Sequence, residues 1–255
     1  RHSLAILKDA GIPHMVGGAY ALARYTGIER HTKDFDVFIR RADFGRAAEA
    51  FRRAGYKAEL TFQHWIGKAF NKDTDDFVDL IYSAGNAVAE VDDQWFERAV
   101  KDQVFGVDVL LIPAEEMIWS KGLIAERERF DGADVCHVVH AVGPKLDWKH
   151  ILFRYADHWR VLYAHLVLYG FIYPSKRENV PRWVIEELTQ RLLAETAAGN
   201  TADERMYGTI ISRQQYLIDI NDWGYRDARL HEHGGRMSAD EIAEWTKGIA
   251  IDGFK

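Results

Sequence analysis

As far as Pro113, the chain has six segments with the hydrophobic pattern of β-strands, with helical segments between them. Apolar residues alternate or run continuously, as in strands, over residues 12–16, 34–39, 56–61, 64–70, 77–82 and 104–112. Helices are predicted over residues 4–10, 19–25 and 44–53. This order predicts a mixed sheet with helices packed mainly on one face, which is an α+β or mixed α/β fold.

The pattern becomes helical after Pro113. Helix is favoured over residues 114–127, 134–142, 148–169, 181–194, 209–220 and 239–249. Breaks occur at Gly143-Pro144, Tyr173-Pro174 and Gly199-Asn200. We therefore expect a sheet domain over residues 1–143 and a helical C-terminal domain over 144–255. The aromatic residues of the segment 148–169 are expected to pack in a core, with a substrate-binding groove as the alternative.

Composition sets few limits on this fold. The chain has 255 residues, of which 47% are hydrophobic and 28% charged, so it is long enough to form substantial cores. Its single cysteine, Cys136, excludes an internal disulfide framework. No apolar run approaches the roughly 18 residues of a membrane span, and no segment has the pattern of a signal peptide. We expect a cytoplasmic protein that does not enter a membrane.

The candidate chemistry lies in two short motifs near the N-terminus. Gly17 and Gly18 precede a predicted helix, where the backbone can approach a ligand closely and free N–H groups can face a phosphate. Asp34 and Asp36 lie two residues apart on a predicted strand, so both side chains point to the same face. Two carboxylates this close repel each other unless a cation lies between them, and a hard ion such as Mg2+ suits oxygen ligands.

These motifs, taken together, resemble those of a known family. Val16-Gly17-Gly18-Ala19-Tyr20-Ala21-Leu22, followed by Arg30-His31-Thr32-Lys33-Asp34-Phe35-Asp36-Val37, is similar to the nucleotidyltransferase superfamily that includes DNA polymerase β. Within it, the pattern is most similar to AbiEii/AbiGii-type toxins and small antibiotic-modifying nucleotidyltransferases. The resemblance covers roughly residues 4 to 142. Gly18 stands sixteen positions before Asp34, more than in compact members, so residues 25–33 are predicted to form an extra loop.

The resemblance implies a third carboxylate on a later strand. Asp79 is in the matching place, within Asp76-Phe77-Val78-Asp79-Leu80-Ile81-Tyr82. On this basis Asp34, Asp36 and Asp79 are the expected catalytic residues and the ligands of Mg2+ or Mn2+. Two such ions would align a nucleoside triphosphate with an acceptor hydroxyl, and Asp79 would lie nearest that hydroxyl.

A triphosphate also requires positive charge in its binding site. The resemblance places Lys121 on a helix where a lysine faces the nucleotide, and the stretch Asp131-Gly132-Ala133-Asp134-Val135 is similar to the acidic end of the same motif. Lys121 has the alternative role of a solvated helix residue. Arg30 and Thr32 are further candidates for binding phosphate or for fixing the loop, and Gly17 and Gly18 complete the predicted nucleotide site.

Three functions are compatible with these observations. The first is a nucleotidyltransferase that moves an NMP group from a nucleoside triphosphate to a small molecule or to RNA. The second is the toxin of a toxin–antitoxin pair, which would modify tRNA and have an antitoxin protein as its partner. The third is a non-catalytic nucleotide-binding or interaction module, which does not need three carboxylates. A zinc site at Cys136, His137 and His140 is disfavoured, because Val138-Val139 indicate an ordinary helix face.

Overall fold

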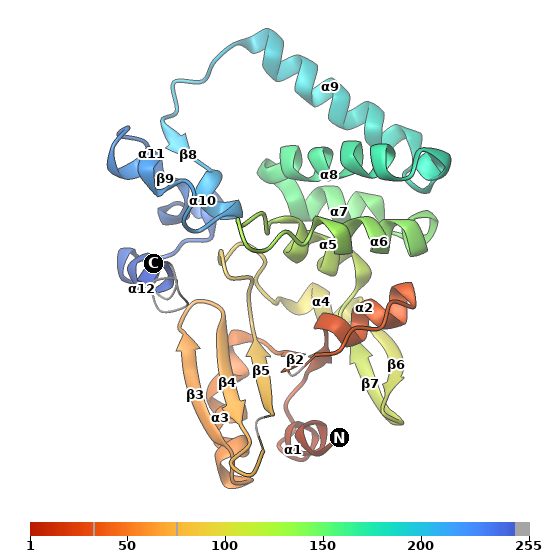
Figure 1. Ribbon diagram of the computed structural model, residues 1–255, viewed down its shortest axis with the longest axis vertical. Helices are drawn as coiled ribbons and strands as arrows, with labels where there is room; N and C mark the ends of the chain where they lie inside the picture. Colours follow the sequence, from red (N-terminus) through yellow and green to blue (C-terminus); the bar gives the residue numbers. More distant parts are fainter. Residues whose placement is uncertain (33, 75, 248–255) are drawn as a thin grey trace. The chain divides into compact units, whose positions relative to one another are not determined.

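The computed structural model describes residues 1–32, 34–74 and 76–247. It divides into two compact units, of which the first comprises Arg1–Pro113 with the segment that begins at Gly234, and the second comprises Ala114–His233 (Figure 1). Lys33 of the predicted loop lies outside the described residues. So do Gly248 and Ile249, at the end of the last predicted helix.

The first unit is built on a mixed sheet, with the fold class that the sequence predicts. Within the described residues the strand order is β3-β4-β5-β2-β1-β7-β6. The strands are β1 (Met15–Val16), β2 (Asp34–Phe38), β3 (Lys57–Phe62), β4 (Ile66–Phe70), β5 (Phe77–Ile81), β6 (Val100–Val104) and β7 (Val107–Leu111). β2 runs parallel to β5 and β1 parallel to β7, whereas the other neighbouring pairs are antiparallel.

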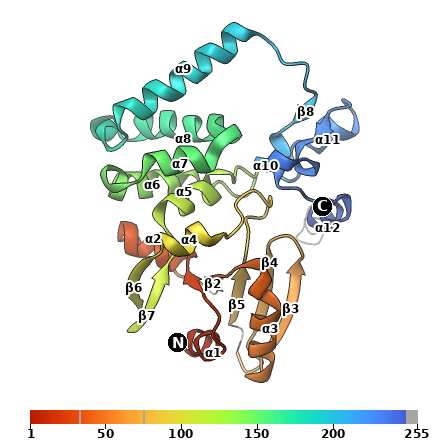
Figure 2. The same ribbon diagram turned by 180° about the vertical axis from the view of Figure 1, so that it is seen from behind.

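Two helices, α1 (His2–Asp9) and α3 (Phe44–Arg53), pack on one face of the sheet (Figure 2). Leu7 of α1 and Phe51 of α3 belong to one buried cluster with Val37 of β2 and Leu80 of β5. Val37 and Leu80 are directly paired across the two parallel strands. Because side chains alternate along a strand, the residues before these two, Asp36 and Asp79, point to the opposite face of the sheet.

Three other helices belong to the first unit, namely α2 (Gly18–Thr26), α4 (Asp93–Glu97) and α12 (Ala239–Lys247). α12 belongs to this unit although it comes last in the chain, since the Trp245 ring packs edge-on against Phe62, 4.8 Å between centroids. Helix α4 has no counterpart among the predicted elements.

The strand predicted over 104–112 is confirmed in part: β7 occupies residues 107–111, but the prediction missed β6, which forms a hairpin with it. Its turn residues, Phe105 and Gly106, have φ angles of 53° and 72°. Positive φ at both central residues is the geometry of a type I′ turn, which joins antiparallel strands tightly.

The second unit is mainly helical, as the sequence predicts. Its helices are α5 (Ala114–Gly122), α6 (Gly132–Val142), α7 (Trp148–Tyr155), α8 (Trp159–Ile172), α9 (Arg182–Ala198), α10 (Gly208–Ile211) and α11 (Leu217–Asn221), with a small parallel pair of β8 (Arg205–Met206) and β9 (Arg226–Asp227). The helix predicted over 148–169 is broken at Ala156, where φ is positive. Trp148, Trp159 and Tyr169 are buried in this unit, whereas Phe153 is exposed. None of the described helices is long and apolar enough to span a lipid bilayer.

The division between the units differs from the boundary that we expected near Gly143. Helix α5 packs with α7 and α8: the Tyr155 hydroxyl donates to the Ile118 carbonyl at 2.8 Å, and His165 Nε2 lies 2.8 Å from the Gly122 carbonyl. These contacts attach α5 and α6 to the helices that follow them. The glycine at position 143 is a turn within the helical unit and does not separate two domains.

Candidate metal centre

Three carboxylates converge on the sheet face opposite the α1–α3 core. Asp34 and Asp36 lie on β2, Asp79 lies on the parallel strand β5, and the register pairs Asp36 with Asp79. One oxygen from each carboxylate lies within 4.8 Å of the others. The structure therefore brings together the three residues that the sequence analysis singled out, and we call Asp34, Asp36 and Asp79 the carboxylate trio.

The two glycines bring the start of α2 directly against this trio. The Gly17 N–H donates to the Asp36 carbonyl at 3.1 Å. At Gly18, where φ is 53°, a Cβ atom would lie 1.6 Å from Asp36 Oδ2. At Gly17, a Cβ would meet the Phe38 ring at 2.2 Å. Gly17 is thus required by packing between strand and helix, and Gly18 is required by the position of the Asp36 carboxylate.

Asp79 is the most buried member of the trio, with 6% of its surface exposed. Burial raises the pKa of Asp79, the nearby Asp34 raises it further, and Lys68 partly opposes both effects. Lys68 Nζ donates to Asp79 Oδ1 at 2.7 Å. The sequence analysis did not identify Lys68. The available signal was a single charged residue in the otherwise apolar strand Ile66–Phe70.

Thr32 and Tyr20 border the trio as well. The Thr32 hydroxyl donates to the Asp34 carboxylate, so Thr32 fixes the end of the loop to a trio member. Tyr20 on α2 packs edge-on against Phe35, with 5.3 Å between ring centroids. Burial raises the pKa of the Tyr20 hydroxyl, and the charges of Asp34 and Asp36 add to the effect. Tyr20 lies within the glycine motif, but the sequence analysis gave this residue no role of its own.

The donor set of the trio fits a hard divalent cation. All three side chains offer carboxylate oxygens, the ligands that Mg2+ and Mn2+ prefer. Like charges at this spacing are destabilising unless a cation compensates them, and the pKa of Asp79 is already raised by burial and by Asp34. The trio has the chemistry of a metal centre.

Two other predicted residues lie outside the strands that carry the trio. Arg30 is exposed in the segment between α2 and β2. Lys121 lies on α5 in the second unit, where its Nζ is 3.0 Å from Asp131 Oδ2 and 2.8 Å from Asp134 Oδ2. Burial alone would raise the pKa of Asp131, but hydrogen bonds and charge from Arg129 and Lys121 outweigh it and hold the pKa below its usual value. Lys121 is therefore joined to the acidic stretch that follows it in the motif.

The structure has no zinc-type arrangement at Cys136, His137 and His140, within the residues that it describes. Cys136 is buried, and burial raises the pKa of its thiol to about 11. The His140 ring packs against Tyr173, with 4.5 Å between ring centroids. This agrees with the ordinary helix face that the flanking valines indicated.

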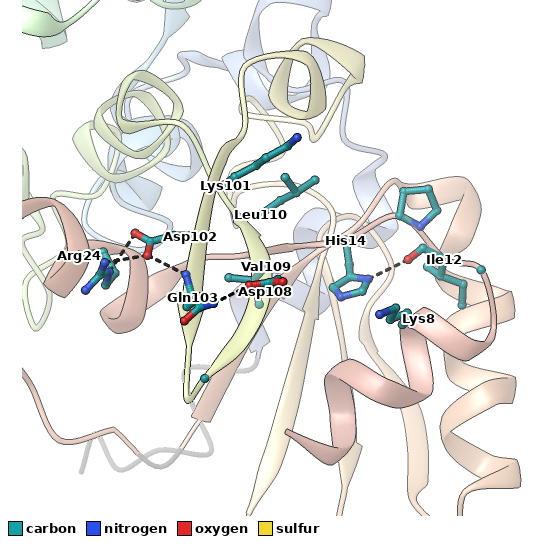
Figure 3. Close-up of a pocket in the computed structure, with 13 residues that line it drawn as sticks. Lys8, Ile12, His14, Arg24, Lys101, Asp102, Gln103, Asp108, Val109 and Leu110 are labelled. Carbon is teal, nitrogen blue, oxygen red and sulfur yellow. Dashed lines mark hydrogen bonds and ion pairs between the residues drawn. The ribbon is translucent and has the colours of Figure 1, made fainter.

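A cavity of about 1150 Å³ lies elsewhere in the first unit, between α1 and the β6–β7 hairpin (Figure 3). Lys8, His14 and Arg24 are among its lining residues, and no member of the carboxylate trio lines it. The Arg24 guanidinium donates to both oxygens of Asp102, at 2.9 and 2.7 Å. The charge of Arg24 is therefore already compensated, and the cavity is separate from the metal centre.

No protein-family model matches the chain, and no match was found among curated proteins. Several solved structures are similar to it. The antibiotic-resistance factor ANT(2'')-Ia is 16% identical, with 77% of this chain and 90% of that chain covered, at a TM-score of 0.38. The lincosamide antibiotic adenylyltransferase LnuA, with lincomycin bound, is 12% identical, with 54% and 92% covered, at a TM-score of 0.39.

A nucleotidyltransferase-like protein from Paracoccidioides brasiliensis is 18% identical, with 70% of this chain and 90% of that chain covered, at a TM-score of 0.46. At these identities and TM-scores the similarities carry no argument about the family or the activity of this chain.

Proposed function

We propose that this protein is a metal-dependent nucleotidyltransferase, which moves an NMP group from a nucleoside triphosphate to an acceptor hydroxyl. The observation that carries the proposal is the convergence of Asp34, Asp36 and Asp79 within 4.8 Å of one another, beside Gly18 at the start of a helix. A non-catalytic nucleotide-binding module would not need three carboxylates held at this spacing.

The three members of the trio would share the metal ions, and Asp79 would have a second part in the reaction. Asp34 and Asp36 would hold both divalent ions, and Asp79 would complete the first ion site. The Thr32 hydroxyl orients the Asp34 carboxylate for this task. Bound ions would neutralise charge on the phosphate oxygens and align the acceptor hydroxyl. Asp79 would take the acceptor proton at Oδ2, since Oδ1 already accepts from Lys68. The raised pKa of Asp79 suits a proton acceptor better than an ordinary carboxylate would.

The start of α2 would bind the phosphates. The Gly17 N–H is already used by the Asp36 carbonyl, so the donors left for a phosphate are the N–H groups that follow it in the first turn. Gly18 supplies the close backbone approach. We assign Arg30 and Lys121 as further phosphate contacts, in line with the sequence motif. The ion pairs of Lys121 with Asp131 and Asp134 mean that a phosphate would share its ammonium with them.

The proposed chemistry applies equally to a small-molecule acceptor and to RNA. A toxin that modifies tRNA would use the same trio and would differ in its acceptor and in having an antitoxin partner. The experiment that tests the function also identifies the acceptor: the protein is incubated with labelled nucleoside triphosphates, Mg2+ or Mn2+, and cell extract. Label in RNA, in a small molecule or in a protein then identifies the acceptor class.

The matched control is Asp36→Asn, which removes one charge of the trio and changes its shape little. We expect this variant to lose transfer while its melting temperature stays unchanged or rises slightly, because repulsion between carboxylates is relieved. Labelling by Asp36→Asn at the rate of the wild type would contradict the proposed function.

A further inference from the structure

Lys68 is placed against the trio by the register of the sheet. β4 and β5 are antiparallel, and their register sets Lys68 directly across from Asp79. The Lys68 ammonium lies 2.7 Å from Asp79 Oδ1, and both side chains are largely buried, at 25% and 9% exposure. A lysine at this point brings a positive charge to the most buried carboxylate of the trio.

The Lys68 ammonium also has a second favourable contact, with an aromatic ring. Lys68 Nζ also lies 4.3 Å from the centroid of the Phe77 ring, on the strand that carries Asp79. An aromatic face attracts a cation, and the long stem of lysine allows the head group to move while the stem stays packed. Lys68 can therefore leave the Asp79 oxygen without losing all of its stabilising contacts.

We propose that Lys68 is a built-in counter-cation of the carboxylate trio, which competes with a divalent metal ion for Asp79. This inference rests on the proposed function, because it assumes that the trio binds metal. The ammonium and the metal ion carry like charge and are drawn to the same carboxylate, so each disfavours the other. Lys68 is thus a positioning residue. Before a metal ion binds, it compensates part of the negative charge of the trio, and it lowers the affinity of the site for a metal ion in the absence of nucleotide.

The test compares the wild type with Lys68→Met and Lys68→Gln. Methionine removes both the charge and the hydrogen bond, whereas glutamine removes the charge but keeps a donor for Asp79. Calorimetric titration with Mn2+ in the absence of nucleotide measures metal affinity, and thermal melting with and without Mn2+ measures stability. We expect both variants to bind Mn2+ about tenfold more tightly than the wild type. Both should melt at a lower temperature than the wild type without metal, and Mn2+ should raise their melting temperatures by more than it raises that of the wild type.

Lys57→Met is the matched control. Lys57 also pairs with a carboxylate at 2.7 Å, that of Glu59, and lies 5.9 Å from an aromatic centroid, but it is on β3, away from the trio. This variant changes the net charge equally and should bind Mn2+ as the wild type does.

Three results would overturn the proposal. Equal Mn2+ affinity in wild type and Lys68→Met would mean that Lys68 does not compete with metal. Weaker binding by Lys68→Met with normal binding by Lys68→Gln would show that Lys68 supports metal binding through its hydrogen bond. Failure of wild type and both variants to bind Mn2+ would remove the metal centre, and with it the proposed function, whereas the first two results leave that function intact.

Discussion

Replacing Gly18 with alanine should destroy the metal centre with only a modest loss of stability. The new Cβ would lie 1.6 Å from Asp36 Oδ2, whereas real Cβ contacts are essentially never closer than 3.0 Å. The Asp36 carboxylate must therefore move by at least 1.4 Å, the difference between these two distances. Metal ligands tolerate displacements of about 0.2 Å, and Mg2+ in particular demands near-ideal geometry, so the displaced carboxylate is lost as a ligand.

Gly27→Ala is the control, because it imposes the backbone strain without the collision. Gly27 ends the same helix with a φ of 74°, and a Cβ there would meet nothing within 4 Å. Alanine in this left-handed region costs roughly 1–2 kcal/mol at either position. Both variants should therefore melt at a lower temperature than the wild type, and Gly18→Ala alone should lose metal binding.

Calorimetric titration with Mn2+ and the labelled-nucleotide assay measure the two variants side by side. We expect at least a tenfold loss of Mn2+ affinity and no transfer by Gly18→Ala, against wild-type values for Gly27→Ala. The reasoning would be refuted if Gly18→Ala bound Mn2+ and transferred nucleotide as well as Gly27→Ala does.

Two further predictions concern the helical unit. Lys121→Ala removes one of the two cations that pair with the largely buried Asp131 while Arg129 remains, so urea unfolding at pH 7 should show a loss of about 1.5–3 kcal/mol, typical of a hydrogen bond to a charged group. Because the pKa of Asp131 is held below its usual value, this contribution is present above the ordinary carboxyl pKa of about 4 and is lost as the pH falls through the lowered pKa, so the stabilities of variant and wild type should converge towards acid pH. If Lys121 also contacts the triphosphate, calorimetry should show a loss of about 1.5–3 kcal/mol in its binding, and equal affinities would leave Lys121 a structural role only. Glu116→Ala removes the buried ion pair in which the Arg154 guanidinium lies 2.9 Å from the Glu116 carboxylate, so we expect urea unfolding to show a loss of about 3–5 kcal/mol; a loss below about 1 kcal/mol would contradict the role of this pair.

Local periodicity determined several features of the protein before any tertiary contact was considered. The two-residue spacing of Asp34 and Asp36 places both carboxylates on one face of a strand, and the structure has them there. The predicted helix over 44–53 coincides with α3, because its apolar positions repeat along one side. These features depend on residues close together in the chain, so the sequence pattern contains the information.

Other features could not be predicted from hydrophobic periodicity. Hydrophobic periodicity at residues 104–112 predicts a strand, but the Phe105-Gly106 turn divides the region into a hairpin. The division between the units falls after Pro113 because the Tyr155 and His165 side chains hold α5 to later helices. Neither the turn nor the contacts that hold α5 change the hydrophobic periodicity of the segments involved.

The candidate site shows the same distinction. The family motif singled out Asp79, but only the parallel register of β2 and β5 sets it opposite Asp36. The antiparallel register of β4 and β5 sets Lys68 across from Asp79, and a lysine in an apolar strand does not by itself indicate which partner it will meet. A shift of one residue in either register would turn these side chains to the other face of the sheet. The sequence by itself predicted the three carboxylates, and tertiary strand pairing decided that they meet one another and Lys68, because register is set by contacts far apart in the chain.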